Sequence, residues 1–212
     1  MSTLFFIFMN ILGSFLYFFI MWRYLKDDYE HEKILRTGFI FLFLIYIFGL
    51  SFNFLIASSI SPSPIFRPQG FWFFGVIMGV FLAALIALKP LKIRIIDLME
   101  AQIPALFFLF FVVSTALGVI NHANLWIISI FLYLFFFILY FVLKANYKKF
   151  GWYRSGRVGF ASLASVGLYF LIRSLIALMI PDMLSLAGRI DAVISFAFAF
   201  LAFYSLYNLS KN

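Results

Sequence analysis

Few side chains in the apolar stretches of this sequence could carry out chemistry, and Arg173 is the most prominent. It follows about fifteen apolar or small residues in "GFASLASVGLYFLIRSLIAL". Ionisable residues in such a stretch are costly and are usually functional or paired. A guanidinium can hold a phosphate or carboxylate through two parallel hydrogen bonds. Two interpretations stay open: anion binding, or a side chain that extends to the headgroup region.

Further polar residues could share one binding site with Arg173. Arg67, Arg189 and Asn121 belong to segments expected on the same side of a membrane, where they could border a cleft for a lipid headgroup. His122 is the one candidate for a general base in this group. The preference of asparagine for turns also explains the segment around Asn121 without any function.

Several kinds of chemistry are excluded by residue type. The sequence has no cysteine, so it can form no disulfide, thiolate metal site or cysteine nucleophile. Its two histidines, His31 and His122, fall in connections expected on opposite sides of a membrane and cannot share an ion. We therefore expect no metal site, and no cofactor is indicated.

The composition indicates an integral membrane protein. Of the 212 residues, 66% are hydrophobic and 11% are charged, whereas a soluble domain is about half apolar and one-quarter charged. Long apolar runs predict transmembrane helices, since backbone groups in hydrocarbon must be satisfied within their own segment. We predict an all-α fold, with residues 1–212 forming a single transmembrane domain. Its seven spans are expected at 4–22, 37–58, 71–88, 101–120, 125–143, 158–180 and 192–209, with earlier starts near Ile95 and Leu186 for the fourth and seventh.

The positive charge is distributed unevenly between the connections. Alternate connections, together with the C-terminal end, hold 13 of the 16 basic residues. The positive-inside rule then predicts a multi-pass protein with its N-terminus out and its C-terminus in. This distribution also explains the net charge of +8, so no nucleic-acid partner is expected.

Most other polar residues favour structural roles. Asp97 and Glu100 are expected to pair with Lys92 or Arg94 near the inner surface. The charged segment "RYLKDDYEHEK" predicts a short solvated helix. Asn10 and Asn53 lie inside predicted spans, where amides commonly form hydrogen bonds between helices.

Glycines in "QGFWFFGVIMGV", residues 69–80, predict close helix packing. Gly75 and Gly79 are four residues apart and share one helical face. The stretch also resembles a motif of the prolipoprotein diacylglyceryl transferases, approximately Gly-Gly-Leu-Ser-Phe-His-Gly-Gly-Leu-Ile-Gly. Further similarity lies in Leu12-Gly13, in Asp97 followed by Pro104, and in the stretches "GFASLASVGLYFLIRSLIAL" and "MLSLAGRIDAVISF".

The departures from that family fall on its signature residues. Phe74 stands in the place of the family's histidine, and Phe111 stands about where a signature arginine belongs. The second key arginine corresponds to Phe170, and Arg173 follows one turn later. Of the signature after the fourth span, only Gly118 plausibly persists.

The resemblance implies a seven-span bacterial enzyme of the cytoplasmic (inner) membrane, oriented N-out and C-in. Such an enzyme transfers diacylglyceryl from phosphatidylglycerol to a lipobox cysteine in the signal peptide of a prolipoprotein. Two functions stay open here. The first is this transfer, with a rearranged site in which His122 is the candidate catalytic residue. The second is a pseudoenzyme, a lipid- or partner-binding protein on the same scaffold without turnover.

Overall fold

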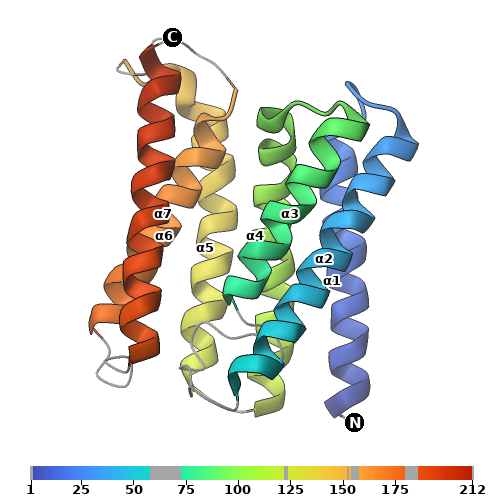
Figure 1. Ribbon diagram of the computed structural model, residues 1–212, viewed down its shortest axis with the longest axis vertical. Coiled ribbons are helices and arrows are strands. Elements are labelled where there is room, and N and C mark those ends of the chain that lie inside the picture. The colour runs from blue at the N-terminus through green and yellow to red at the C-terminus, as the bar shows by residue number, and fades with distance from the viewer. Residues whose placement is uncertain are drawn as a thin grey trace. The chain divides into compact units, whose positions relative to one another are not determined.

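All regular structure in the described part of the chain is helical, which confirms the all-α class (Figure 1). The computed structural model describes residues 2–57, 73–121, 124–151, 153, 158–179 and 186–211. Within these ranges the α-helices are α1 (Ser2–Leu25), α2 (His31–Ala57), α3 (Phe73–Leu91), α4 (Ile95–Asn121), α5 (Asn124–Asn146), α6 (Phe160–Met179) and α7 (Leu186–Lys211). A 3-10 turn, η2 (Tyr147–Lys149), follows α5.

Five of the described helices contain a stretch that is long and apolar enough to cross a membrane. These stretches are Leu4–Leu25, His31–Ser51, Ile95–Ala116, Ile127–Lys149 and Ala192–Lys211. The apolar parts of α3 and α6 are shorter, at Gly75–Leu88 and Phe160–Ile176. Large apolar side chains such as Phe8, Phe131 and Phe200 are exposed. Exposed side chains of this kind suit hydrocarbon, because large apolar patches are rare on the surface of water-soluble monomers.

The helix starts refine the predicted boundaries. α4 begins at Ile95 and α7 at Leu186, as the earlier of the predicted starts required. The prediction of a separate short helix in "RYLKDDYEHEK" is wrong, because α1 extends to Leu25 and α2 already begins at His31. The acidic residues explain the early start of α2. Ile34 N–H donates to Glu30 O at 3.1 Å, and the Glu30 carboxylate lies 3.1 Å from Lys33 Nζ. Acidic groups at a helix N-terminus are favoured by the helix dipole.

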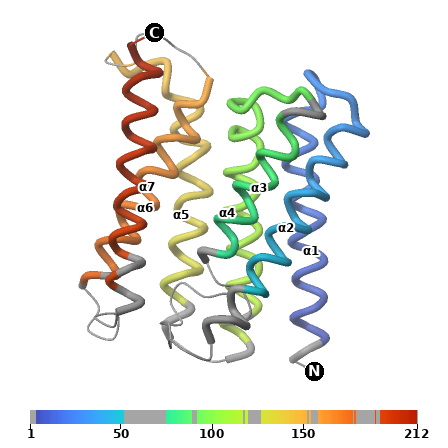
Figure 2. The backbone as a smooth tube through the Cα atoms, viewed as in Figure 1, coloured from blue at the N-terminus to red at the C-terminus, as the bar shows by residue number. Residues whose placement is uncertain are grey.

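The chain divides into two compact units, Met1–Leu134 and Phe135–Asn212. In the first unit, α1 packs chiefly against α4, and α2 packs against α3. In the second unit, α6 packs against α7. Figure 2 traces the first four helices from blue to green, and α6 and α7 from orange to red.

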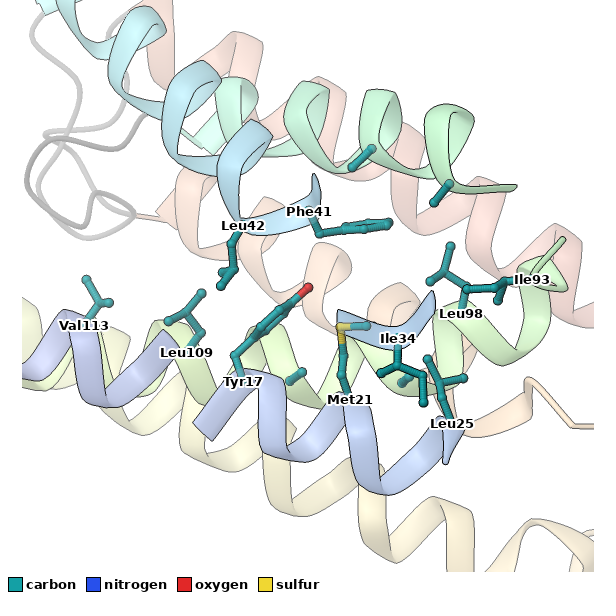
Figure 3. Packing of buried hydrophobic residues seen from close by; sticks show 14 residues of the cluster. Tyr17, Met21, Leu25, Ile34, Phe41, Leu42, Ile93, Leu98, Leu109 and Val113 are labelled. Carbon is teal, nitrogen blue, oxygen red and sulfur yellow. The ribbon is translucent and has the colours of Figure 1, made fainter. Parts of the chain in front are cut away.

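The first unit has one main apolar core, drawn from its first four helices (Figure 3). Tyr17 and Met21 of α1 are fully buried in it, beside Phe41 of α2. Small buried side chains recur on the other two helices, at Ala83, Ala87, Ala101 and Ala105. Small residues let helix backbones approach closely, which is the usual way membrane helices gain packing energy.

The backbones of α2 and α3 approach each other closely at Gly79 of α3. A Cβ atom built on Gly79 would lie 2.6 Å from Leu44 O and 2.9 Å from Ile45 Cα of α2. Both atoms belong to the backbone, so no side-chain rotation could make room. Gly75, one turn earlier, is also buried. The glycine pair therefore lies where α3 needs a smooth surface.

Candidate functional site

Arg173 is buried in the second unit, on α6. Arg173 is 2% exposed, and its side chain is the largest of the fully buried side chains among the described residues. Guanidinium Nη1 lies 3.5 Å from the hydroxyl oxygen of Tyr169, one turn earlier on the same helix. This burial is inconsistent with an arginine that extends into water at the headgroups. The charge is instead enclosed by protein, where electrostatic interactions are stronger than in water.

An aromatic side chain supports the tyrosine that contacts Arg173. The ring of Phe136 meets the ring of Tyr169 edge to face, with centroids 5.4 Å apart. Phe136 is fully buried, and it belongs to the part of α5 that lies in the second unit. Edge-to-face pairs of this kind fix ring orientation and contribute about 0.5–1.5 kcal/mol beyond burial. The Tyr169 hydroxyl is therefore held in one place beside the guanidinium.

Contacts between α6 and α7 fix the helix that presents Arg173. Ser174 Oγ donates to the carbonyl oxygen of Ala192 on α7 at 3.0 Å. A Cβ atom built on Gly167 would lie 3.0 Å from the ring of Phe203, so these helices touch closely here. Small and hydroxyl-bearing residues are the usual means of joining helices in a membrane. The position of Arg173 is thus determined by its neighbours on both sides.

The other residues predicted for this site are placed less completely. Arg67 and His122 lie outside the described residues. Asn121 is the last residue of α4, and its side chain also lies outside the described part. Arg189 is exposed in the first turn of α7, unlike the buried Arg173. The grouping of these residues around one headgroup stays a prediction.

Two phenylalanines at positions predicted to correspond to signature arginines pack against other aromatic rings. Phe111 lies 6.0 Å from Phe108, measured between ring centroids. Phe170 stacks on Phe198 of α7 at 5.2 Å with an interplanar angle of 25°. The side chain of Phe74 lies outside the described residues. Both described phenylalanines contribute aromatic packing.

Asp97, in the first unit, forms an ion pair with Arg94 and accepts a hydrogen bond from Tyr29. Arg94 Nε lies 2.6 Å from Asp97 Oδ2, which confirms the predicted local ion pair. The Tyr29 hydroxyl donates to the same carboxylate oxygen at 2.7 Å and accepts the Arg94 backbone N–H at 3.1 Å. The hydrogen bond to Asp97 raises the pKa of the Arg94 guanidinium, which stays charged. Lys92 directly follows α3 and adopts the left-handed region at φ 51°, which lets the chain turn toward α4.

A buried polar contact between α1 and α4 escaped the sequence analysis. The Tyr17 hydroxyl donates to Gln102 Oε1, and Gln102 Nε2 donates to Met21 Sδ at 3.1 Å. The signal available in the sequence was a lone amide, Gln102, within an apolar span. Asn10 does confirm the predicted role of such amides, since its Oδ1 accepts from the Tyr46 hydroxyl of α2 at 3.0 Å.

Within the described ranges, no group of three His, Cys, Asp or Glu residues lies close enough to hold a metal ion. Comparison with protein-family models, curated proteins and solved structures gave no match to this chain.

Proposed function

We propose that this protein is a polytopic membrane protein that binds the phosphate of an anionic phospholipid, such as phosphatidylglycerol, at Arg173 without turnover. The observation that carries the proposal is an arginine that is 2% exposed in an apolar helix, with Nη1 3.5 Å from the Tyr169 hydroxyl. Ionisable residues inside an apolar span are usually functional or paired, and a phosphate is an anion that a guanidinium holds through two parallel hydrogen bonds.

The chemistry of the two side chains suits a phosphate ester. Guanidinium keeps its charge at all ordinary pH and presents a planar set of donors that matches two phosphate oxygens. The Tyr169 hydroxyl can donate to a third oxygen, because its ring is held by Phe136 at 5.4 Å. A lipid bound here would exchange slowly, since neighbouring side chains must move before a 2%-exposed group can be reached.

Aromatic packing at the signature positions favours binding over catalysis. Phe170 stacks on Phe198 at 5.2 Å, and Phe111 packs near Phe108. Neither side chain can donate to a developing anion or move a proton. Loss of a general acid or base alone commonly costs about 10²–10⁴-fold in rate. A chain with these replacements can keep the lipid-holding role of the scaffold more readily than its chemistry.

The proposal includes seven spans in a bacterial inner membrane, with the N-terminus out and the C-terminus in. α3 and α6 have 19 and 20 residues. At 1.5 Å per residue each reaches about 28–30 Å, near the thickness of the hydrocarbon core. If α6 begins at the inner surface, Arg173 lies about 20 Å along it and therefore in the outer half of the bilayer.

The decisive experiment measures phospholipid that stays bound to detergent-purified protein. Arg173→Gln removes the charge and the paired guanidinium donors but keeps a polar side chain. It should lower the affinity for phosphatidylglycerol about tenfold or more. Arg173→Lys should retain part of the binding as a point charge. Arg23→Gln is the matched control, because Arg23 is exposed on α1 and belongs to no predicted site. Extraction and mass spectrometry give the lipid count, and circular dichroism checks the fold.

Two results would contradict this proposal. Equal phosphatidylglycerol retention by the wild type and a folded Arg173→Gln protein would remove Arg173 from any lipid site. Equal losses in Arg173→Gln and Arg23→Gln would mean that general surface charge, rather than the buried site, retains the lipid.

Diacylglyceryl transfer is the second candidate. Two positions of the resemblance, Gly13 and Gly79, lie at close helix contacts, with Leu109 Cδ1 3.1 Å from a Cβ built on Gly13. In this reaction a thiolate of the prolipoprotein forms a bond to the glyceryl carbon. The bond from that carbon to the phosphate oxygen breaks, and glycerol phosphate leaves. His122 is the candidate base for the thiol proton.

The two candidates differ in turnover. Purified protein is mixed with labelled phosphatidylglycerol and a lipobox peptide from a prolipoprotein signal sequence, and label on the peptide is followed. Label transfer that Arg173→Ala abolishes would replace the binding proposal with the enzymatic one. Absence of transfer with lipid retention intact supports binding without turnover.

A further inference from the structure

One end of the second unit carries lysines without acidic residues nearby in the sequence. At this end α5 and α7 finish and α6 begins (Figure 1). We call it the basic end and define it by Lys144, Lys148, Lys149 and Lys211. The sequence contains no Asp or Glu from Ala101 to Pro181, and none from Ala192 to Asn212. The positive charge is therefore not balanced within these stretches.

Aromatic rings hold three of these ammonium groups. Lys144 Nζ lies 5.7 Å from the ring centroid of Tyr140 and 3.4 Å from its hydroxyl. The corresponding distances to the ring centroids are 6.0 Å for Lys148 over Tyr147 and 4.3 Å for Lys211 over Tyr207. Cation–π contact at an exposed site orients a lysine but leaves its charge in place.

The connection that bears Lys148 and Lys149 is folded against α6. Ring centroids of Tyr147, Phe150 and Tyr153 lie 6.2, 5.5 and 4.7 Å from that of Phe160, the first residue of α6. Two backbone bonds close the turn, from Phe150 N–H to Tyr147 O at 3.3 Å and from Tyr153 N–H to Phe150 O at 2.9 Å. Lys149 Nζ donates to Asn146 Oδ1 at 3.0 Å.

The lysines lie where two apolar stretches end. Lys149 is the last residue of the membrane-span stretch that begins at Ile127, and Lys211 is the last residue of the one that begins at Ala192. Span ends lie at the level of the lipid headgroups, where lysine and tyrosine are favoured. An ammonium there meets lipid phosphates directly, and anionic lipids attract such groups more than neutral ones.

We propose that the basic end gathers anionic phospholipids from the surrounding leaflet. The lysine ammonium acts as a point charge and lacks the planar set of donors by which an arginine guanidinium distinguishes headgroup geometry. Selection at this surface therefore follows lipid charge, weakens with salt, and differs from the single buried site proposed at Arg173. The proposal depends on the protein being embedded in a membrane, and it does not depend on lipid binding at Arg173.

The experiment compares lipids in contact with the full-length protein. The protein is reconstituted in phosphatidylcholine bilayers that contain spin-labelled phosphatidylglycerol or spin-labelled phosphatidylcholine. Electron paramagnetic resonance then gives the association constant of the anionic lipid relative to the neutral one. The wild-type ratio should exceed one and fall toward one as salt is raised. Each Lys→Gln change at the basic end should lower the ratio by up to about fivefold.

The variant Lys148→Gln/Lys149→Gln/Lys211→Gln tests the surface, and the arginine triple at the same positions tests charge alone. Lys33→Gln is the matched control, because Lys33 already pairs with Glu30 at 3.1 Å. We expect the glutamine triple to lose most of the preference, while the arginine triple and Lys33→Gln keep it. Arg154 and Arg157 stay unchanged, since they lie outside the described residues.

Other outcomes would overturn the proposal. A folded glutamine triple with the wild-type ratio would show that the basic end does not select lipids, as would an equal fall in Lys33→Gln. Arg173→Gln should leave the ratio for fast-exchanging lipid unchanged. If Arg173→Gln abolishes the preference while the glutamine triple keeps it, selection belongs to the buried site instead.

Discussion

Tyr17 and Ser165 represent two outcomes for a hydroxyl group inside this protein. Tyr17 is fully buried and donates to Gln102 Oε1, which joins α1 to α4. Ser165 in α6 is also fully buried, but its Oγ has no hydrogen-bond partner within the described structure. Leaving a buried partner unsatisfied costs about 1–3 kcal/mol, whereas removing an already unsatisfied group costs little. The two positions should therefore respond in opposite ways to loss of the hydroxyl.

Tyr17→Phe should destabilise the protein by about 1–3 kcal/mol, because it leaves the Gln102 amide oxygen without its donor. Ser165→Ala is the matched loss of one hydroxyl and should be neutral or stabilising. Thermal unfolding in detergent, followed by circular dichroism, measures both changes. An unchanged melting temperature for Tyr17→Phe would show that this contact contributes nothing to stability.

Between elements, close packing depends on positions where no side chain fits. Gly79 brings α3 against the backbone of α2, and a Cβ there would meet Leu44 O at 2.6 Å. Gly151 belongs to the turn after α5, and a Cβ built on it has nothing within 4 Å. The same chemical change therefore meets two very different surroundings.

Gly79→Ala should destabilise the first unit by about 1–3 kcal/mol, because α2 and α3 must move apart to accept the methyl group. Gly151→Ala should change stability by no more than about 0.5 kcal/mol. Both are measured by thermal unfolding in the same detergent. Equal effects at the two positions would contradict the tight contact between α2 and α3.

The sequence predicted the helices well because long apolar runs have few alternatives in a membrane. It predicted the end of α1 and the start of α2 poorly, because charge spacing in "RYLKDDYEHEK" fits either a separate helix or the ends of two longer ones. For the candidate site, the type and position of Arg173 were readable, but its burial was not. Burial depends on which neighbours face it, and Tyr169 gained a role only through the geometry of α6.

At the scale of the whole molecule, the number of helices that cross the membrane decides on which side the basic connections lie. The described helices include five stretches able to span a bilayer, with α3 and α6 having shorter apolar parts. If all seven helices cross, the connection after α1 and the one after α5 share the inner side. If α3 and α6 do not cross, the connection after α5 lies on the opposite side from the connection after α1. The two arrangements give different patterns of chemical access.

Single cysteines can separate these arrangements, because the chain contains none of its own. Glu30→Cys and Gly151→Cys should react with a membrane-impermeant maleimide only after the cells are opened. Arg67→Cys should react in intact cells, since its connection is predicted outside. Labelling of Glu30→Cys in intact cells would reverse the proposed orientation. Different sides for Glu30→Cys and Gly151→Cys would contradict the seven-span topology.

The Tyr29 hydroxyl joins two connections that are far apart in the sequence. It contacts Asp97 at 2.7 Å and the Arg94 backbone at 3.1 Å, so the turn after α1 is fastened to the start of α4. The turn region contains Lys26, followed by Lys33, and a protease such as trypsin cuts after lysine only where several residues can unfold into its cleft. We therefore expect Tyr29→Phe to speed tryptic cleavage in this exposed, lysine-containing turn, which itself buries little.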